Sequence, residues 1–490
     1  MRGVLGNPPY SGHSANTGQW IANLLRGVDS SQGGSPTGNY FAVDGQKLAE
    51  RNPKWLNDDY VKFIRFAQWR IERTGHGVLA FVTNHGYLDN PTFRGMRQSL
   101  MQSFDDIYLL DLHGNSKKKE KTPGGGKDDN VFDIQQGVAI GLFVRRPDAK
   151  RRSARLARVH HADLYGLRKE KYAALDSQDV NSTPWQPLAP AAPNYYFVPQ
   201  DIGLLVEYER GWKVTEAMPV NVLGFQTHRD DFAIDMDSTA LRNRIVEMRD
   251  EELTENEFAE KYKINDSTEW SLSAARKLLT VDDEWETRFN PVAYRPFDIR
   301  HSYYSEIVID RPRKEIIQHV AGKQNICIGI GRAGNAVSEE VWSLQTVAIY
   351  PLDANVFRRG GVNVFPLWLY PNKTPVDLLE AAETEKRPNL SDKFVAALKA
   401  AQGRAITPED TLAYLYAVLY TPGYRTRYAD FLKRDFPRVP LTGNPELFAQ
   451  LVKLGHELIG LHTLQTAPAR ITGFPVAGSG EVVKPRFAIA

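Results

Sequence analysis

The sequence GVLGNPPYSG at residues 3–12 places a short apolar run directly before a turn with two consecutive prolines. Val4 and Leu5 favour a β-strand. Pro8 and Pro9 end that strand, because proline has no backbone N–H to donate to a sheet. Each proline also fixes its own φ angle, so the carbonyls of the turn point in set directions. The stretch therefore predicts a strand that ends in a stiff, polar turn.

The Asn-Pro-Pro-Tyr part of this turn resembles the catalytic motif of N6-adenine DNA methyltransferases. The N6 lone pair of adenine is delocalised into the ring and is a poor nucleophile. The resemblance implies that the Asn7 side-chain oxygen and the Pro8 carbonyl accept hydrogen bonds from that amino group. Tyr10 would stack on a base swung out of the duplex. Asn7, Pro8, Pro9 and Tyr10 form the candidate catalytic set, with a purely structural turn as the alternative.

Strand and helix patterns alternate after the turn, which predicts a doubly wound α/β sheet. The expected helices cover residues 60–73 and 93–104, and the expected strands cover 77–84, 107–112 and 137–144. Phe63, Ile64, Ala67 and Ile71 give the first helix its apolar face. The order of elements resembles the second half of a gamma-ordered adenine methyltransferase. It implies a catalytic-motif half, with a partial Rossmann-like sheet, over residues 1–165.

That family carries a second aromatic residue on the other face of the flipped base. Phe132, in the segment before the last expected strand, is the candidate, and a core phenylalanine is the alternative. Residues 116–130 are rich in Lys, Gly and Asp and predict a loop. Lys117, Lys118 and Lys119 in this loop are candidate DNA contacts.

A change of pattern separates the two halves of the chain. Residues 166–194 end in a Pro-rich stretch and predict a linker. From 195 to about 375 short strands, aromatic residues and arginines dominate. Helical patterns follow, one starting at Thr407-Pro408 and one over 446–461. Residues 195–490 therefore predict an α+β domain with a helical C-terminal part.

Residues 285–314 interleave aromatic side chains with arginines. Arginine binds phosphates or guanine edges, and aromatic rings stack or wedge between bases. An antiparallel sheet with solvated arginines is an equally good interpretation of the spacing. Tyr-Arg-Pro-Phe-Asp at 294–298 and Arg-Pro-Arg at 311–313 also resemble the specificity domain of single-chain restriction–modification enzymes, including the type ISP group. The candidate DNA contacts here are Arg288, Arg295, Arg300, Arg311 and Arg313.

The resemblance implies S-adenosylmethionine as methyl donor, bound by a Phe-x-Gly-x-Gly turn before the catalytic motif. Six residues precede Asn7, so that cofactor-binding half is expected to be missing and its residues cannot be named. A missing N-terminal segment or subunit would complete the enzyme. The strand at residues 2–5 is expected at an exposed sheet edge. Gly329-Ile-Gly-Arg-Ala-Gly334 has the glycine spacing of a dinucleotide turn, but a poor helix pattern follows it.

Composition adds limits. The chain has 490 residues, 42% hydrophobic and 24% charged, typical of a globular protein of two to four domains. The net charge of +2 means that any DNA-binding surface is local. The single cysteine, Cys327, excludes a disulfide framework. His160-His161 lacks metal-ligand spacing, and no metal site is expected. The sequence has no run of about 18 apolar residues, so no membrane span is expected. A cytoplasmic location is expected.

Together these features predict site-specific methylation of adenine N6 in double-stranded DNA, by base flipping, within a restriction–modification system. Two alternatives stay open. One is a protein or RNA nitrogen methyltransferase, which can share the Asn-Pro-Pro-Tyr motif. The other is a DNA-binding specificity fragment that does not methylate as an isolated chain.

Overall fold

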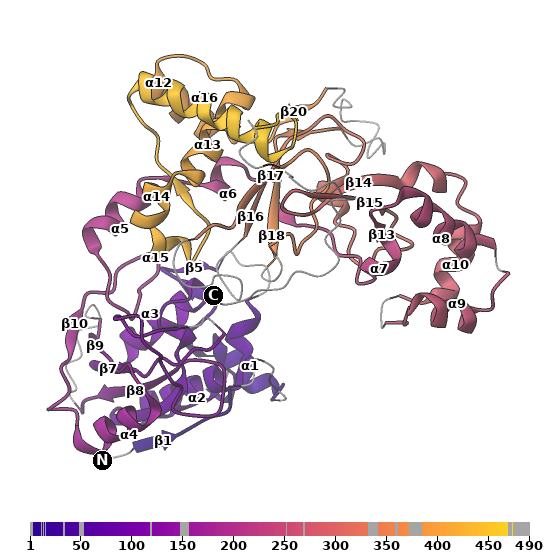
Figure 1. Ribbon diagram of the computed structural model, residues 1–490. Helices are drawn as coiled ribbons and strands as arrows, with labels where there is room; N and C mark the ends of the chain where they lie inside the picture. Colours follow the sequence, from indigo (N-terminus) through magenta and orange to yellow (C-terminus); the bar gives the residue numbers. More distant parts are fainter. Residues whose placement is uncertain are drawn as a thin grey trace.

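The computed structural model describes residues 3–10, 12, 14, 16–32, 35–48, 53–117, 120–147, 156–250, 252–267, 270–331, 342–357, 361–371, 385–468 and 473. An α/β unit from the first part of the chain lies at the bottom of Figure 1, and the C-terminal helices lie at the top. A group of helices, α8 to α10, projects to the right. Within the described ranges, no helix is long and apolar enough to cross a membrane.

The N-terminal unit is built on a six-stranded mixed sheet in the order β1-β6-β8-β7-β9-β10. The strands are β1 Gly3–Gly6, β6 Gly77–Asn84, β7 Asp106–Asp111, β8 Val138–Arg145, β9 Arg158–Asp163 and β10 Gln186–Leu188. β1 is parallel to β6, and β7 is parallel to β9. β8 runs antiparallel between β6 and β7. The sheet is therefore mixed, and β1 lies at its edge as the sequence predicts.

Two helices form where the sequence predicts them. α2 (Asp59–Thr74) begins after Asp58, whose side chain accepts a hydrogen bond from the Asp59 N–H. α3 (Arg94–Ser103) follows the short 3-10 helix η4 (Pro91–Phe93). Ile64, Ala67 and Ile71 of α2 are buried against the sheet unit as expected. Phe63 is a correction, because it lies outside that face and is 42% exposed.

Residues 166–194 differ from the predicted linker. They contain α4 (Arg168–Ser177) and β10, which pairs antiparallel with β9. Lys171 of α4 is fully buried, and its Nζ lies 2.8 Å from Asp128 Oδ1. Proline is tolerated on edge strands as well as in linkers, so composition did not separate the two. Most of this segment is part of the N-terminal unit.

Residues 30–38 are rich in Gly and Ser, a composition typical of a loop, but they contain regular structure. They hold the 3-10 helix η1 (Ser30–Gln32), and β3 (Ser35–Asn39) forms a hairpin with β2 (Arg26–Asp29). Tertiary contacts stabilise regular structure in this segment despite its Gly/Ser-rich composition. Other short elements here are α1 (Gln19–Leu25), β4 (Ala42–Val43), β5 (Gln46–Lys47), η2 (Lys54–Asn57) and η3 (His85–Tyr87).

Two small antiparallel sheets form the middle of the chain. One has the order β12-β18-β16-β17, and the other has the order β13-β15-β14. Their strands are β12 Val222–Leu223, β13 Ile234–Asp235, β14 Phe289–Arg295, β15 Asp298–Tyr303, β16 Cys327–Gly331, β17 Gln345–Ala348 and β18 Val362–Pro366. The strand pairs β11 (Trp212–Lys213) with β21 (Arg438–Val439), and β19 (Trp368–Leu369) with β20 (Arg387–Pro388), complete this region.

A helical group interrupts these sheets and was not predicted from the sequence. It consists of α8 (Ser238–Asp250), α9 (Glu255–Tyr262) and α10 (Leu272–Thr280). Leu241, Ile245 and Met248 of α8 pack with Phe258 of α9 in one buried cluster. Leu241, Ile245 and Met248 have the spacing of one helix face, a signal that sequence reasoning missed. Short helices α5 (Ile202–Glu209), α6 (Val214–Ala217), α7 (Asp230–Ala233), η5 (Trp285–Arg288) and α11 (Lys314–Ile317) lie around the sheets.

The C-terminal helices match the prediction closely. α13 (Pro408–Tyr420) begins with Thr407 as N-cap, whose hydroxyl accepts from the Asp410 N–H. α16 (Pro445–His462) packs along α13, with α12 (Asp392–Gln402), α14 (Pro422–Arg427) and α15 (Ala429–Leu432) nearby. Leu412, Leu415, Tyr416 and Leu419 are all fully buried. The fold is thus a mixed α/β protein with a helical C-terminal part.

Candidate functional site

The Asn-Pro-Pro-Tyr turn follows directly after the edge strand β1. Asn7 and Pro9 are exposed, Pro8 is buried, and Tyr10 is half-buried. The Tyr10 ring packs edge-on against Tyr60 of α2, with the ring centroids 6.5 Å apart. Burial raises the pKa of the Tyr10 hydroxyl. The turn therefore presents an uncharged aromatic ring beside an accessible amide.

A cleft of about 260 Å³ opens beside Tyr10. Its aromatic residues are Tyr10, Trp55, Tyr60 and Phe93. Its polar residues are Asp58, Asn84, His85, Asp89, Asn90, Asn115, Lys117 and Gln136. The ends of β6 and β7 supply several of these, because the chain leaves both strands at the same edge of the sheet. The cleft combines flat apolar walls with hydrogen-bonding groups.

Phe132 does not line this cleft. It packs against the small buried cluster of Leu112, Val131 and Val138. Trp55, whose exposed fraction is 44%, is the more accessible aromatic residue at the cleft. Lys117 lies at the cleft and is exposed, whereas Lys118 and Lys119 lie outside the described residues.

Beside the cleft lies a group of histidines and acids that we name the His–acid cluster. Its members are His85, Asp111, His113, Glu120, His161 and Asp163. His85 Nδ1 lies 3.0 Å from Asp111 Oδ1. His113 bonds to two acids, with Nδ1 3.2 Å from Glu120 Oε1 and Nε2 2.8 Å from Asp163 Oδ1. The cluster joins the ends of β6, β7 and β9 to the loop that carries Glu120.

The histidines and acids of the His–acid cluster shift one another's pKa values. Burial by itself lowers the pKa of His113, but hydrogen bonds to Asp163 and Glu120 and the nearby Asp111 charge raise it to about 10. Burial raises the pKa of Asp111, but His85 and His113 outweigh it and hold that pKa well below its usual range. The Tyr165 ring stacks on His113 with centroids 3.8 Å apart. The neighbouring acids therefore stabilise the protonated form of His113.

The five candidate arginines of residues 285–314 differ in how closely an acid contacts their guanidinium groups. Arg288 Nε lies 2.7 Å from Asp282 Oδ2, and Arg295 Nη1 lies 3.0 Å from Asp353 Oδ1. Arg300 makes a two-pronged contact with Asp298 at 2.8 to 3.0 Å. β14 and β15 around them form the antiparallel hairpin that was the alternative interpretation.

Arg311 and Arg313 follow that hairpin in the chain. Arg311 is the most exposed of the five, and its nearest acid, Asp310, is 3.9 Å away. Arg313 has a left-handed backbone, with φ of 55°, directly before α11. Its buried Nε has no hydrogen-bond partner among the described residues.

Residues 216–489 match the sequence model of a known family, described as the Type ISP C-terminal specificity domain. The chain belongs to this family. All five candidate arginines and the C-terminal helices lie inside the type ISP match. No curated protein matches the chain.

Three solved structures are similar to almost the whole chain. They are the ATP-dependent type ISP restriction–modification enzyme LlaBIII bound to DNA, the DrdV–DNA complex, and a nuclease-deletion mutant of the type ISP enzyme LlaGI with a DNA substrate mimic. The TM-scores are 0.66, 0.64 and 0.63, at 21%, 22% and 20% identity. The matches cover 96%, 94% and 94% of this chain.

This chain spans 30%, 44% and 35% of those three proteins, respectively. At these identities the similarity shows a shared fold. The type ISP chain described here therefore has a mixed α/β fold that larger restriction–modification enzymes also contain.

Sequence reasoning missed the His–acid cluster. The signal was present, because Asn84-His85 and His113-Gly114-Asn115 each follow a predicted strand. Polar residues at the ends of neighbouring strands meet at one edge of a sheet. Glu120 could not be assigned, because the path of the 116–130 loop is fixed by tertiary contacts.

Proposed function

We propose that this chain carries the catalytic turn and the specificity domain of a DNA adenine-N6 methyltransferase in a restriction–modification system. The observation that carries the proposal is the Asn-Pro-Pro-Tyr turn beside an aromatic-lined cleft, in a chain that belongs to the type ISP specificity family. The proposed division is the catalytic-motif half over 1–165 and the recognition domain over 195–490. Residues 166–194 connect them through α4 and β10.

The target base would leave the duplex and enter the cleft beside Tyr10. The Asn7 side-chain oxygen and the Pro8 carbonyl would accept hydrogen bonds from the amino group and draw its nitrogen toward tetrahedral geometry. Tyr10 would stack on one face of the base. Trp55 is better placed than Phe132 for the other face, because Trp55 lines the same cleft. The cleft volume of about 260 Å³ suits one small planar group.

The methyl donor of such an enzyme would be S-adenosylmethionine. Gly329 and Gly331 lie inside the buried strand β16, between β17 and β18. A Cβ atom at Gly329 would lie 2.9 Å from the Thr346 side chain, so this glycine serves packing.

Sequence recognition is proposed for the type ISP specificity region. The relatives with the same fold include enzymes solved with DNA, which supports double-stranded DNA as the partner. This favours DNA over a protein or RNA substrate. Arg311 is the arginine best placed to reach DNA, since acids hold Arg288, Arg295 and Arg300 in the described conformation.

One observation favours the second candidate, a specificity fragment that does not methylate alone. Among the residues that the structure describes, β1 pairs only with β6, and Leu5 on it is 75% exposed. We propose that an N-terminal methyltransferase segment or subunit docks at this edge and supplies the donor site. Cofactor titration of the isolated chain separates the two candidates, since weak or absent binding is expected for the fragment.

The test is to map N6-methyladenine in the genomic DNA of cells that carry the intact gene region. Wild type is expected to modify one sequence motif, and Asn7→Ala is expected to lose it, because removing an acceptor at the reacting amine costs on the order of 10²-fold in rate. Asn256→Ala, at an exposed position of α9, is the matched control and should keep the modification. Full modification by Asn7→Ala would overturn the catalytic assignment.

A further inference from the structure

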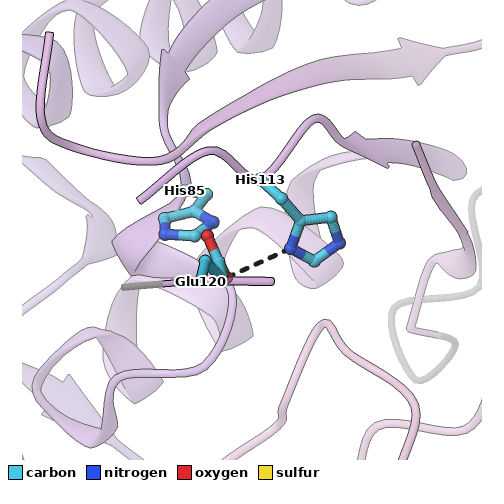
Figure 2. A group of neighbouring side chains, drawn as sticks. All are labelled: His85, His113 and Glu120. Carbon is cyan, nitrogen blue, oxygen red and sulfur yellow. Dashed lines mark hydrogen bonds and ion pairs between the residues drawn. The ribbon is translucent and has the colours of Figure 1, made fainter. Parts of the chain in front are cut away.

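The His–acid cluster has the parts of a metal site. One ligand atom from each of His85, His113 and Glu120 lies within 4.8 Å of the other two. Figure 2 shows the three side chains converging from separate segments, with the Glu120 carboxylate between the two rings. The two histidines and Asp111 are buried, and Glu120 is half-buried. Histidines and carboxylates packed this closely must be stabilised by shared protons or by a bound ion.

Both histidines are already oriented by a second acid. Asp111 accepts from His85 Nδ1, and Asp163 accepts from His113 Nε2. Metal-binding histidines almost always donate their other ring N–H to a carboxylate or carbonyl in this way. The arrangement leaves His85 Nε2 and His113 Nδ1 as the ligand nitrogens. A second oxygen of Glu120 is fixed by the Asn115 backbone N–H at 2.8 Å.

We propose that His85, His113 and Glu120 bind one divalent transition-metal ion of the zinc class. Two imidazoles and a carboxylate are a ligand set that suits zinc. Two ligands 2.0–2.1 Å from a tetrahedral ion lie roughly 3.3 Å apart, and His113 Nδ1 and Glu120 Oε1 are 3.2 Å apart. The ion takes the place of the proton between these two atoms.

Local charge supports a dication at this position. Asp111, Glu120 and Asp163 bring three carboxylates to two imidazoles in a mostly buried space. The Asn115 amide, 3.2 Å from His85 Nε2, lies where it can turn its oxygen to the ion as a fourth ligand. Gly137 packs against the His85 ring, since a Cβ there would lie 2.3 Å from it, and so helps to hold the ring in place.

The ion would fasten the loop around Glu120 to the ends of β6 and β7. The same loop supplies Asn115, Lys117 and Gln136 to the cleft beside Tyr10. The metal therefore has a positioning role for one wall of that cleft. The site stands on its own geometry and does not require the proposed methyl transfer.

The experiment uses the full chain, treated with a chelator and then titrated with Co²⁺ as a spectroscopic substitute for zinc. One ion per chain and the intense visible absorption of tetrahedral cobalt are expected. Asp111→Asn should weaken binding by roughly 10–100-fold, because it removes an orienting partner. Glu120→Gln should weaken it further, and His76→Ala, at an exposed position, should leave it unchanged.

Glu120→Gln nearly preserves shape, so its folding is checked by its circular dichroism spectrum before titration. Unchanged Co²⁺ affinity in folded Glu120→Gln would overturn the proposal. So would the octahedral cobalt spectrum or the absence of stoichiometric binding by the wild type. Loss of binding in His161→Ala alone would place the ion in the neighbouring group of Asp111, His161 and Asp163 and would also overturn it.

Discussion

At the residue scale, Asp353 shows how burial and an ion pair compete at one carboxylate. Its side chain is 1% exposed, it accepts from Arg295 at 3.0 Å, and it accepts from the Asn355 N–H at 2.8 Å. Burial nevertheless dominates and raises its pKa to about 6. The folded chain therefore holds this proton more tightly than the unfolded chain does.

This pKa shift predicts a pH dependence of stability. The folded pKa lies above the unfolded value of about 3.9, so the stabilisation is complete below pH 4 and is lost as pH rises through 6. The loss amounts to about 3 kcal/mol at most. Asp353→Asn should remove this pH-dependent stabilisation. Urea unfolding at pH 4 and pH 7 measures the free energy of unfolding of the wild type and of Asp353→Asn. The difference between the two proteins should be smaller at pH 7 than at pH 4, by up to about 3 kcal/mol. The same difference at both pH values would contradict the assignment.

Arg311 and Arg300 give a second residue-scale prediction. Arg311 is half-exposed and its Nε lies 3.9 Å from Asp310 Oδ2, whereas Arg300 is held by Asp298 at 2.8 Å. Arg311→Ala should weaken specific DNA binding by about 1–3 kcal/mol if it reads a base. Arg300→Ala should have a smaller effect, because its charge is already paired. Equilibrium binding to the recognised duplex measures both, and the reverse order would argue against the placement of the DNA surface.

At the element scale, the C-terminal helices depend on one close approach. Gly455 of α16 packs directly on α13, and a Cβ there would lie 2.0 Å from the Ala413 carbonyl oxygen. That oxygen belongs to the backbone and cannot move alone. The two helices must separate to admit a side chain at Gly455.

Gly455→Ala should therefore destabilise the chain by about 1–3 kcal/mol or more. Gly423→Ala in α14 is the matched control, because a Cβ there meets nothing within 4 Å. The control should be neutral or slightly stabilising, since alanine favours a helix. Thermal unfolding of both variants gives the measurement. A wild-type melting temperature for Gly455→Ala would show that the packing is looser than described.

The elements also show how far sequence reasoning carries. α13 was predicted from its cap and apolar face, because Thr407, Pro408 and the buried leucines are local signals. The helices α8 to α10 bury few residues each, and they are stabilised by one another. Only part of the cleft could be predicted from the sequence. Tyr10 could be assigned from its motif, whereas Trp55 and the His–acid cluster come together only through the tertiary fold.

At the scale of the whole molecule, the two halves of the chain meet at specific contacts. Arg434 of the C-terminal region has its Nε 3.8 Å from Oδ2 of Asp89 in the N-terminal unit, and its guanidinium lies 5.1 Å from the Tyr196 ring centroid. The edge strand β1 and the exposed Asn7 belong to the other unit. A recognition domain joined in this way would set the position of the cleft on the DNA.

The most direct test is selection of bound sequences from a random duplex library with the purified chain. The proposed function predicts one enriched motif that contains the adenine modified in cells, and Arg311→Ala should reduce its enrichment. Asn7→Ala should enrich the same motif as the wild type, because Asn7 acts on the amine and not on recognition. Absence of any enriched motif, or a motif unrelated to the modified adenine, would contradict the account.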